Sequence, residues 1–558
     1  MTMDAGNQLV SAMGVYSGTL IAVGSPQSVE RSIHKLQSKS GWFAHLFGLR
    51  RIDLQGKTVL PGFVDAHSHF PASGIASAGI DVSSPPFGTN SSVESILSSV
   101  ADQSHNQSDE RWIIGFNYDD AGLQEKRHPT REELDLAAPD HAVYLRHRSG
   151  HMGVANSRAL IELGIEPGDA GEQAAGAAID SKKTDLWSRG LLQEHAAPGL
   201  SRLLKELPWW KLPGIVFRAR DEYLHAGVTT VQNGFADKQT LQILRWSARL
   251  GIVPQRMVLW PAHDKLDHSD VKLPPISDNE PQVGDSGLRL AQAISWPEDA
   301  SQNLKIGAIK LVADGSPQGR TAWLTKPYLQ DDNLSQGYDG LAYLQREKLH
   351  RLISQYHHAG IQLAIHGNGD AAVQSIIDGI RLAQKQYPRS DARHILVHAQ
   401  VINDRQLSEL SELDVGVSFF PTHTYYWGDW YRFTVLGEQR ARVISPLASA
   451  DAAGVRYSIH ADSPVTPMNP MQMLWSSTER RTTSGYLLGA NQRVSRLRAL
   501  RAMTIDAAWQ NFLEDDRGSL EPGKLADFIV LSEDPLLAKD VRQISVLETW
   551  IAGKRRFP

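Results

Sequence analysis

The sequence predicts an α/β protein centred on a parallel (β/α)8 barrel of the TIM type, and three observations favour this fold class. Short apolar segments rich in β-branched residues alternate with amphipathic segments after residue 225. Eight strand candidates occur, most of them followed by a helix, and a repeated strand–helix unit is typical of a parallel sheet. No Gly-x-Gly-x-x-Gly motif stands at a strand-to-helix turn, which disfavours the alternative of an open, doubly wound sheet.

The expected strands are short runs of apolar and β-branched residues. The run 227–232, for example, is rich in Val and Thr, which favour strands. In chain order the candidates are the run from 62 into His67, then 227–232, 253–260, 306–312, 361–365, 394–397, 415–419 and 455–459.

Amphipathic helices are expected between these strands. Asp237 opens one helix that Gly251 ends, and a second helix runs from 344 to 358. Asp370 is expected to cap a third helix, because the apolar residues after it follow the i, i+3, i+4, i+7 pattern of a buried helix face. These apolar residues are Val373, Ile376, Ile377 and Ile380.

Two regions interrupt the strand–helix alternation. Residues 75–215 are rich in Ser, Pro, Gly and Asp and separate the first two barrel strands, so we expect a large insertion over the carboxyl-terminal face of the barrel. β-rich runs near both ends of the chain predict one small β-sandwich domain built from residues 1–58 and 513–558. The barrel is expected to cover residues 59–512.

Composition excludes several classes of function. The formal net charge is -5 over 558 residues, and the absence of a dense Lys/Arg tract argues against a nucleic-acid partner. The absence of cysteine excludes disulfides, thiolate nucleophiles and Cys-ligated zinc. No apolar run approaches the ~18–20 residues of a membrane helix, and the N-terminus lacks the pattern of a signal peptide. We therefore expect a cytoplasmic enzyme without a membrane partner.

A His-x-His motif ends the first expected strand. Because side chains alternate along a strand, His67 and His69 project from the same face, about 6–7 Å apart. Two imidazoles aimed at one point can hold a metal ion. The alternative is an ordinary pair of surface or core histidines.

Further possible ligands stand on later strands of the series. Lys310 lies inside the apolar run 306–312, and His366, His398 and Asp462 follow three other runs. The carboxyl ends of barrel strands meet at one face, so the barrel would bring these side chains together. Each residue also has a structural alternative: a hydrogen-bonded core histidine, a lysine that reaches solvent, or an aspartate that caps a loop.

This order of residues resembles the amidohydrolase superfamily, which has His-x-His on strand 1, Lys on strand 4, His on strands 5 and 6 and Asp on strand 8. The resemblance is closer to the YtcJ-like branch, which includes N-substituted formamide deformylases. The similar segments are Val59–His69, Asp314–Ala322, His366–Ala372, Val397–Gln400, Ala461–Val465 and the closing run Gly518–Asp527.

One departure from the family pattern lies at the N-terminus. Relatives usually begin with a further strand before the region that matches Met1–Asp4. Either the small β-domain has one strand fewer, or the sequence begins downstream of that strand.

The resemblance implies two divalent metals, zinc by ligand type, with manganese, iron or cobalt as alternatives. It also implies that Lys310 is carbamylated and bridges the two metals, since burial would keep the lysine amine neutral and reactive. The other implied ligands are His67, His69 and Asp462 for the first metal, and His366 and His398 for the second. A single metal is the alternative if Lys310 is unmodified.

The implied reaction is cleavage of an amide or formamide-type carbon–nitrogen bond of a small molecule by a metal-activated hydroxide. Asp462 would accept the proton and return it to the leaving nitrogen. Gly369, three residues after His366, stands where deaminase relatives have Glu, which disfavours deamination. The alternatives are an esterase, lactonase or cyclic-amide hydrolase at the same site, or a barrel that has lost its activity. The resemblance also implies a homodimer.

Substrate contacts are expected from three places. His151, in the run Arg148–His151, matches a recurrent motif of the branch and would lie in the insertion facing the site, as a substrate contact or a structural residue. Arg320 would bind a substrate oxygen or pair with Asp314. The aromatic run that follows strand 7, with His423 and Trp427, is expected to form an apolar pocket wall or ordinary packing.

Overall fold

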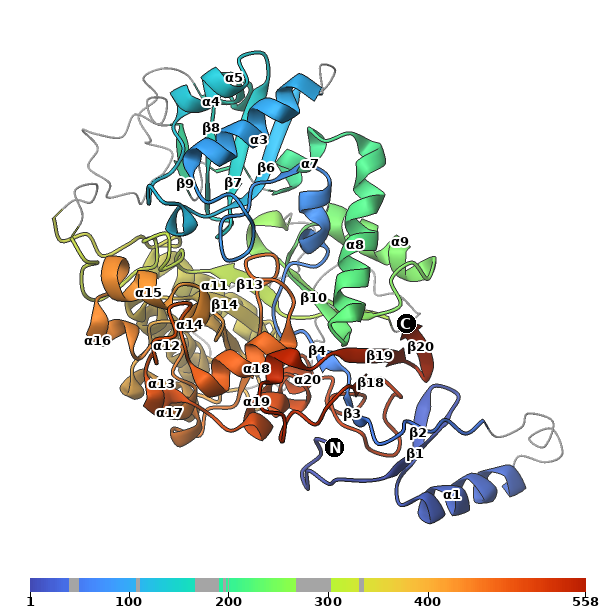
Figure 1. The fold of residues 1–558 in the computed structure, drawn as a ribbon. Coiled ribbons are helices and arrows are strands. Elements are labelled where there is room, and N and C mark those ends of the chain that lie inside the picture. Colours follow the sequence, from blue (N-terminus) through green and yellow to red (C-terminus); the bar gives the residue numbers. More distant parts are fainter. Residues whose placement is uncertain are drawn as a thin grey trace.

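The computed structural model describes residues 1–39, 50–106, 111–165, 190–193, 197–198, 200–266, 303–330 and 336–558. They form a mixed α/β protein in which parallel strands and their helices make the largest part, and a second sheet stands apart from them at the top of Figure 1. Among these residues, no helix combines the length and the apolar character needed to cross a bilayer.

Two parallel sheets contain the eight predicted strand regions. The first has the order β12 (Leu304–Ile306), β11 (Arg256–Pro261), β10 (Val228–Ala236) and β4 (Phe63–Val64). The second has the order β13 (Ile309–Val312), β14 (Leu363–Gly367), β15 (Ile395–His398), β16 (Gly416–Phe419) and β17 (Tyr457–Ile459).

The expected strand 306–312 is divided between the two sheets. Its first part, β12, pairs with β11, and its second part, β13, pairs with β14. Gly307 lies at the break, where a Cβ atom would come within 2.7 Å of the Trp260 indole. The close approach of Trp260 therefore requires glycine at this position.

Several contacts join the two sheets. A parallel bridge pairs Ala262, just after β11, with Lys310 of β13. The loops after the first and last strands are also connected, because the Asp462 amide donates to the His67 carbonyl at 3.1 Å and the His69 amide donates to the Ser463 carbonyl at 2.9 Å. One cluster of buried apolar side chains draws on strands of both sheets, and it includes Val64, Val258, Trp260, Ala364 and Val397.

Helices separate most of these strands, as the sequence pattern predicts. They are α8 (Leu212–His225), α9 (Lys238–Arg249), α11 (Arg346–His358), α12 (Asp370–Gln386), α13 (Asp404–Glu412) and α17 (Leu447–Ala452). Asp237 caps α9 as expected, since its carboxylate accepts from the Thr240 amide at 2.7 Å.

The predicted capping role of Asp370 is wrong. Gly369 is the N-cap of α12, and Asp370 is the first residue of the helix. The Asp370 carboxylate instead accepts from the Thr325 amide at 2.8 Å, so it holds a neighbouring loop.

The described part of the predicted insertion folds as a five-stranded sheet with its own apolar core. Its strands are β5 (Ile80–Asp81), β6 (Trp112–Tyr118), β7 (Ala142–His147), β8 (Met152–Ala155) and β9 (Leu191–Gln193). Its helices include α3 (Val93–Asn106), α4 (Arg131–Ala137) and α5 (Ser157–Leu163). Residues 107–110, 166–189, 194–196 and 199 of this span lie outside the described residues.

The two ends of the chain contribute to one sheet and one apolar cluster. The sheet has the antiparallel order β20 (Lys554–Phe557), β19 (Val546–Ile551), β18 (Phe528–Leu531) and β3 (Thr58–Pro61). The expected hairpin is present as β1 (Ala12–Tyr16) and β2 (Thr19–Gly24), followed by α1 (Pro26–Lys39). Leu20 packs with Phe528 and Val530 in the shared cluster.

Further helices cover the parallel strands and the loops above them. They are α14 (His423–Tyr426), α15 (Gly428–Trp430), α16 (Glu438–Ala441), α18 (Pro470–Glu479), α19 (Arg496–Ala502) and α20 (Ile505–Trp509). Helix α7 (Leu200–Lys205) instead packs with the sheet of the insertion, through Leu203.

Candidate metal centre

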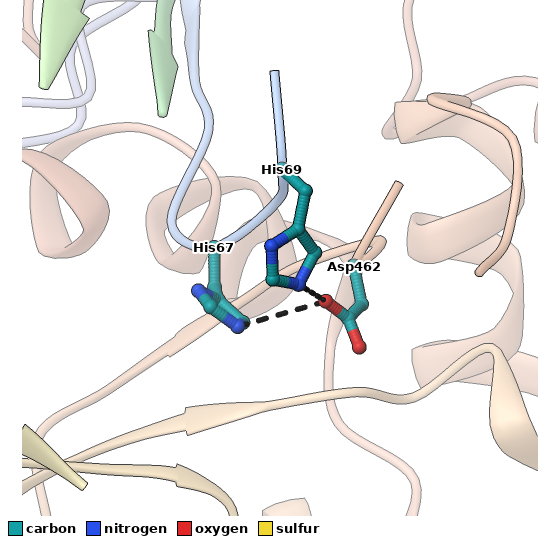
Figure 2. Close-up of side chains that lie close together, drawn as sticks. All are labelled: His67, His69 and Asp462. Atoms are coloured by element: carbon teal, nitrogen blue, oxygen red, sulfur yellow. Dashed lines mark ion pairs between the residues drawn. The ribbon is translucent and has the colours of Figure 1, made fainter. Parts of the chain in front are cut away.

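Three of the predicted ligands converge where the first and last parallel strands end. The His69 Nε2 atom lies 3.2 Å from Asp462 Oδ1, and the His67 Nε2 atom lies 3.6 Å from the same oxygen (Figure 2). These atoms are close enough for one metal ion to bind all three side chains. Asp462 Oδ1 is buried and accepts no hydrogen bond from the described residues, which is what a metal-binding oxygen requires.

Lys310 enters the same group from β13. Its Nζ atom lies 3.2 Å from His67 Nε2, and the lysine is almost fully buried. Burial lowers the pKa of Lys310 to about 7, although the Asp462 carboxylate acts in the opposite direction. A large share of the lysine is therefore neutral near pH 7, which is the form that can react with carbon dioxide.

His366 and His398 complete the group from β14 and β15. Their ring centroids are 4.5 Å apart, and the His398 ring lies 5.4 Å from the His67 ring. The Nε2 atom of His366 lies 3.0 Å from the carbonyl oxygen of Gly315, which can only accept a hydrogen bond. Asn368 Nδ2 also lies 3.0 Å from Nε2, but it donates to the same Gly315 carbonyl at the shorter distance of 2.8 Å. This arrangement favours a proton on His366 Nε2, with Nδ1 left as its metal-binding atom.

The ionisation of the group suits a cation site. Burial, followed by neighbouring positive charge, holds the pKa values of His67, His366 and His398 well below the ordinary range, so all three are neutral. Burial alone would raise the pKa of Asp462, but the close side-chain contact with His69 and nearby positive charges lower it. Neutral imidazoles and an ionised carboxylate are the forms that bind divalent metals.

Two of these residues have an unusual backbone. His398 has a φ of 77° and Asp462 a φ of 52°, both in the left-handed region that non-glycine residues seldom adopt. Strained backbone of this kind persists where the surrounding structure fixes it, and it is often found at functional sites.

The residue that positions the His67 ring was not predicted. Trp260 of β11 stacks on His67 with ring centroids 5.4 Å apart and an interplanar angle of 17°. On the other side, a Cβ atom at Gly234 would come within 2.1 Å of the His67 ring. Neither Trp260 nor Gly234 carries a metal-binding group, so a search for ligands in the sequence has no signal for them.

One of the predicted substrate contacts, His151, lies next to a ligand of this group. The His151 ring of the insertion is 5.5 Å from the His366 ring. His423 and Trp427 lie together with ring centroids 4.9 Å apart, and both are buried. The aromatic run after β16 therefore packs against the insertion, and Trp427 Nε1 donates to Asp119 at 2.8 Å.

Arg320 lies beside the aromatic run. Its Nη2 atom donates to the Thr434 carbonyl at 3.2 Å, and its guanidinium carbon lies 5.9 Å from the centroid of the Trp430 ring. Asp314, its suggested partner, accepts from the backbone amides of Trp323, Asn368 and Gly369 at 2.8–2.9 Å.

Arg148 connects the insertion to the loop after β17. One nitrogen donates to the carbonyls of Pro464 and Val465 at 3.3 and 3.2 Å, and the other donates to Ser83 at 2.8 Å. The insertion thus contacts the loop that carries Asp462.

A second group of possible ligands lies in the insertion and was not predicted. It consists of Asp119, Asp120 and His147, at the ends of β6 and β7. The Ser149 hydroxyl and amide lie 2.9 and 3.1 Å from His147 Nδ1, and His147 Nε2 faces Asp120 Oδ1 at 3.1 Å. Hydrogen bonds therefore account for this group without a metal ion.

Comparison with known proteins identifies the family. The model of the amidohydrolase family matches residues 50–557, which is most of the chain. The chain belongs to this family, as its motifs predict. It is therefore a hydrolase that acts on carbon–nitrogen bonds other than peptide bonds.

Relatives match along nearly the whole chain. The chain is 27% identical to the N-substituted formamide deformylase of Arthrobacter pascens over 565 residues, which cover 100% of this chain and 96% of that protein. It is 24% identical to YtcJ of Bacillus subtilis (strain 168), which is named as an amidohydrolase, over 89% of this chain and 88% of that protein. An uncharacterised metal-dependent hydrolase from Pyrococcus horikoshii has a similar fold, with a TM-score of 0.68, 24% identity and 95% of each chain covered.

Proposed function

We propose that this protein is a metal-dependent hydrolase that cleaves an amide or formamide-type carbon–nitrogen bond of a small molecule. In this proposal the two parallel sheets form a (β/α)8 barrel, with the small β-domain and the insertion in the predicted spans. A cytoplasmic location and a homodimer stay predictions of the sequence.

One observation carries the proposal. Six potential metal ligands from five parallel strands, up to 395 residues apart in the sequence, lie in one group, and all of them except His69 are buried. They are His67, His69, Lys310, His366, His398 and Asp462. The group contains one carboxylate and four imidazoles, and at least three of the imidazoles are neutral, which fits zinc or a related divalent metal.

Each ligand has an assigned role. His67, His69 and Asp462 would hold one metal, His366 and His398 a second, and a carbamylated Lys310 would bridge the two. When bound, the metals supply polarisation of the substrate carbonyl and activation of water.

Asp462 moves the proton. Its carboxylate is ionised, so it would accept the proton of the attacking water and deliver that proton to the leaving nitrogen. His151, whose ring lies 5.5 Å from that of His366, would contact the carbonyl group of the substrate.

The aromatic residues favour an apolar substituent on the substrate. His423, Trp427 and the neighbouring Phe420 form a buried aromatic wall after β16. Together with the likeness to an N-substituted formamide deformylase, this wall supports a formamide that carries an aromatic or aliphatic group on nitrogen.

The test is a substrate panel measured on the zinc-loaded enzyme. We expect N-formyl and N-acyl amides with apolar amine groups to be hydrolysed, and Asp462→Ala to lose at least 1,000-fold in kcat/KM (about 4 kcal/mol). His34→Ala, an exposed histidine of α1, is the control and should retain full activity.

Two outcomes would contradict the proposal. Faster hydrolysis of the paired esters or lactones than of the amides would favour the esterase alternative. A zinc-free chain without activity on any substrate would favour a barrel that has lost catalysis.

A further inference from the structure

A line of buried hydrogen bonds connects His398 with the strand that carries His67. His398 Nδ1 lies 3.1 Å from His460 Nε2, and the other nitrogen of that ring, His460 Nδ1, lies 2.8 Å from Ser418 Oγ. Ser418 Oγ lies 3.1 Å from Ser458 Oγ, which in turn lies 2.6 Å from Gln510 Oε1. Gln510 Nε2 then donates to the Ala66 carbonyl. No member is more than 3% exposed, so the line has little access to solvent. We call these six residues the His398 chain.

The direction of hydrogen-bond donation along the His398 chain is fixed at its last member, the Ala66 carbonyl. The Ala66 carbonyl can only accept, so the Gln510 atom that faces it is the amide nitrogen. The other side-chain atom of Gln510 is then an oxygen, which accepts the proton of Ser458. Because that proton is used, Ser458 accepts from the Ser418 hydroxyl.

The same logic reaches His398. Since the Ser418 proton is given to Ser458, His460 Nδ1 must donate to Ser418, and a neutral His460 then has a lone pair on Nε2. His398 Nδ1 therefore carries the proton that His460 accepts. The lone pair of His398 is left on Nε2, its only atom able to bind a metal.

We infer that Ser418, Ser458 and Gln510 are positioning residues that hold His398 in its metal-binding tautomer. The inference rests on the proposed function, in which His398 is a metal ligand. The two histidines of the second metal are fixed by different means: His366 by the single carbonyl of Gly315, and His398 by the chain that ends at Ala66.

Removal of one hydroxyl from the His398 chain should reverse the direction of its remaining hydrogen bonds. In Ser458→Ala the Ser418 hydroxyl has lost its acceptor, and its remaining partner is His460 Nδ1. Ser418 would then donate to His460, His460 would donate to His398 Nδ1, and the proton of His398 would move to Nε2. That proton blocks the metal-binding atom, although three hydrogen bonds separate Ser458 from His398.

The experiment measures Zn²⁺ affinity of the metal-free full-length protein by competition with a chromophoric chelator. We expect Ser458→Ala to bind the more weakly held zinc about 10–100-fold less tightly than wild type. Ser458→Thr, which keeps the hydroxyl, should bind within about threefold of wild type. Ser375→Ala, which removes a buried serine of α12 outside the chain, is the matched control and should not change affinity.

Thermal unfolding of the metal-free variants separates tautomer control from a general loss of structure. We expect Ser458→Ala and Ser375→Ala to unfold within a few degrees of each other. Equal zinc affinity in these two variants, or a Ser458→Thr variant as weak as Ser458→Ala, would overturn the inference while leaving the metal site intact. A wild-type protein that binds no zinc would overturn the proposed function together with it.

Discussion

At the scale of single residues, the site depends on neighbours that carry no metal-binding group. His67 is enclosed between the Trp260 indole and the backbone of Gly234. Its Nε2 atom is thereby directed toward Lys310 and Asp462. The orientation of the ligand is fixed by packing before any metal binds, which reduces the cost of forming the site.

Substitution of Gly234 tests this enclosure. In Gly234→Ala the new methyl group would lie 2.1 Å from the His67 ring, so the ring must move away from the metal-binding position. We expect zinc affinity to fall at least tenfold, measured by chelator competition. Gly214→Ala in α8, where a Cβ atom has no neighbour within 4 Å, is the control. Unchanged affinity in Gly234→Ala would show that His67 is not a ligand.

Two buried histidines outside the metal site, His357 and His394, make the free energy of unfolding depend on pH. The Leu363 amide donates to His394 Nδ1 at 3.0 Å, His394 donates to His357 at 2.8 Å, and His357 donates to the Tyr387 carbonyl at 2.7 Å. When both rings are neutral, all four ring nitrogens take part in these hydrogen bonds. Neither ring can therefore bind a further proton without losing a hydrogen bond. Burial lowers the pKa of His357 to about 4 and that of His394 well below its ordinary value.

Acid should therefore destabilise the folded chain. Between the ordinary histidine pKa of about 6.5 and the folded value of His357, only the unfolded chain binds the proton. The free energy of unfolding therefore keeps its full contribution from these histidines above pH 6.5. It decreases as the pH falls toward 4, by about 1.4 kcal/mol per pH unit for each such histidine. Urea unfolding midpoints of the metal-free protein at pH 7.5–4.5 measure this slope. A smaller slope is expected for His357→Gln, and a slope equal to that of the exposed-site variant His34→Gln would contradict the account.

At the scale of elements, loops are held by buried polar groups as well as by apolar packing. Helix α18 ends at Glu479, and the next residue, Arg480, is its C-cap with a left-handed φ of 49°. Its fully buried guanidinium donates to the carbonyls of Leu488, Ser445 and Ile444 at 2.8–3.0 Å. One side chain thus connects the end of α18 to the segment that precedes α17.

Arg480→Met is expected to be strongly destabilising. It removes the donors of three buried carbonyls, and an unsatisfied buried polar group costs about 1–3 kcal/mol. Thermal unfolding should begin several degrees lower than in wild type. The control is Arg481→Met, whose exposed side chain bonds only one carbonyl, that of Gly485, among the contacts described. Equal melting temperatures in the two variants would rule out a structural role for the buried guanidinium.

Arg148 provides one of the contacts between the insertion and the loop after β17. Arg148 holds the carbonyls of Pro464 and Val465, two and three residues after Asp462. We expect Arg148→Ala to lower kcat/KM about tenfold or more, because the loop that carries Asp462 loses its support. Arg158→Ala, an exposed residue of the same insertion, should retain wild-type kinetics. Wild-type kinetics in Arg148→Ala would show that the insertion does not position Asp462.

At the scale of the whole molecule, the sequence predicts the parallel strands and their helices well, because hydrophobic periodicity is a local property. The same periodicity indicates where strands end, so the sequence alone predicts the six potential ligands. The sheet of the insertion was not predicted, since β5–β9 mix parallel and antiparallel pairs and their segments are rich in turn-forming residues.

Features that depend on distant contacts could not be predicted. The Asp119, Asp120 and His147 group forms only when β6 pairs with β7, and the His398 chain joins residues from three strands and a C-terminal helix end. The break at Gly307 depends on the position of Trp260, 47 residues earlier. Local pattern contains none of this information.

The proposed function depends on six side chains that bind divalent metal as one group. They are those of His67, His69, Lys310, His366, His398 and Asp462. The most direct measurement is the metal content per chain of zinc-incubated, gel-filtered protein, compared between wild type and His67→Ala. We predict about two zinc ions per wild-type chain and the loss of at least one in the variant, with unchanged secondary structure by circular dichroism. No zinc in the wild-type protein, or equal zinc in both proteins, would contradict the claim.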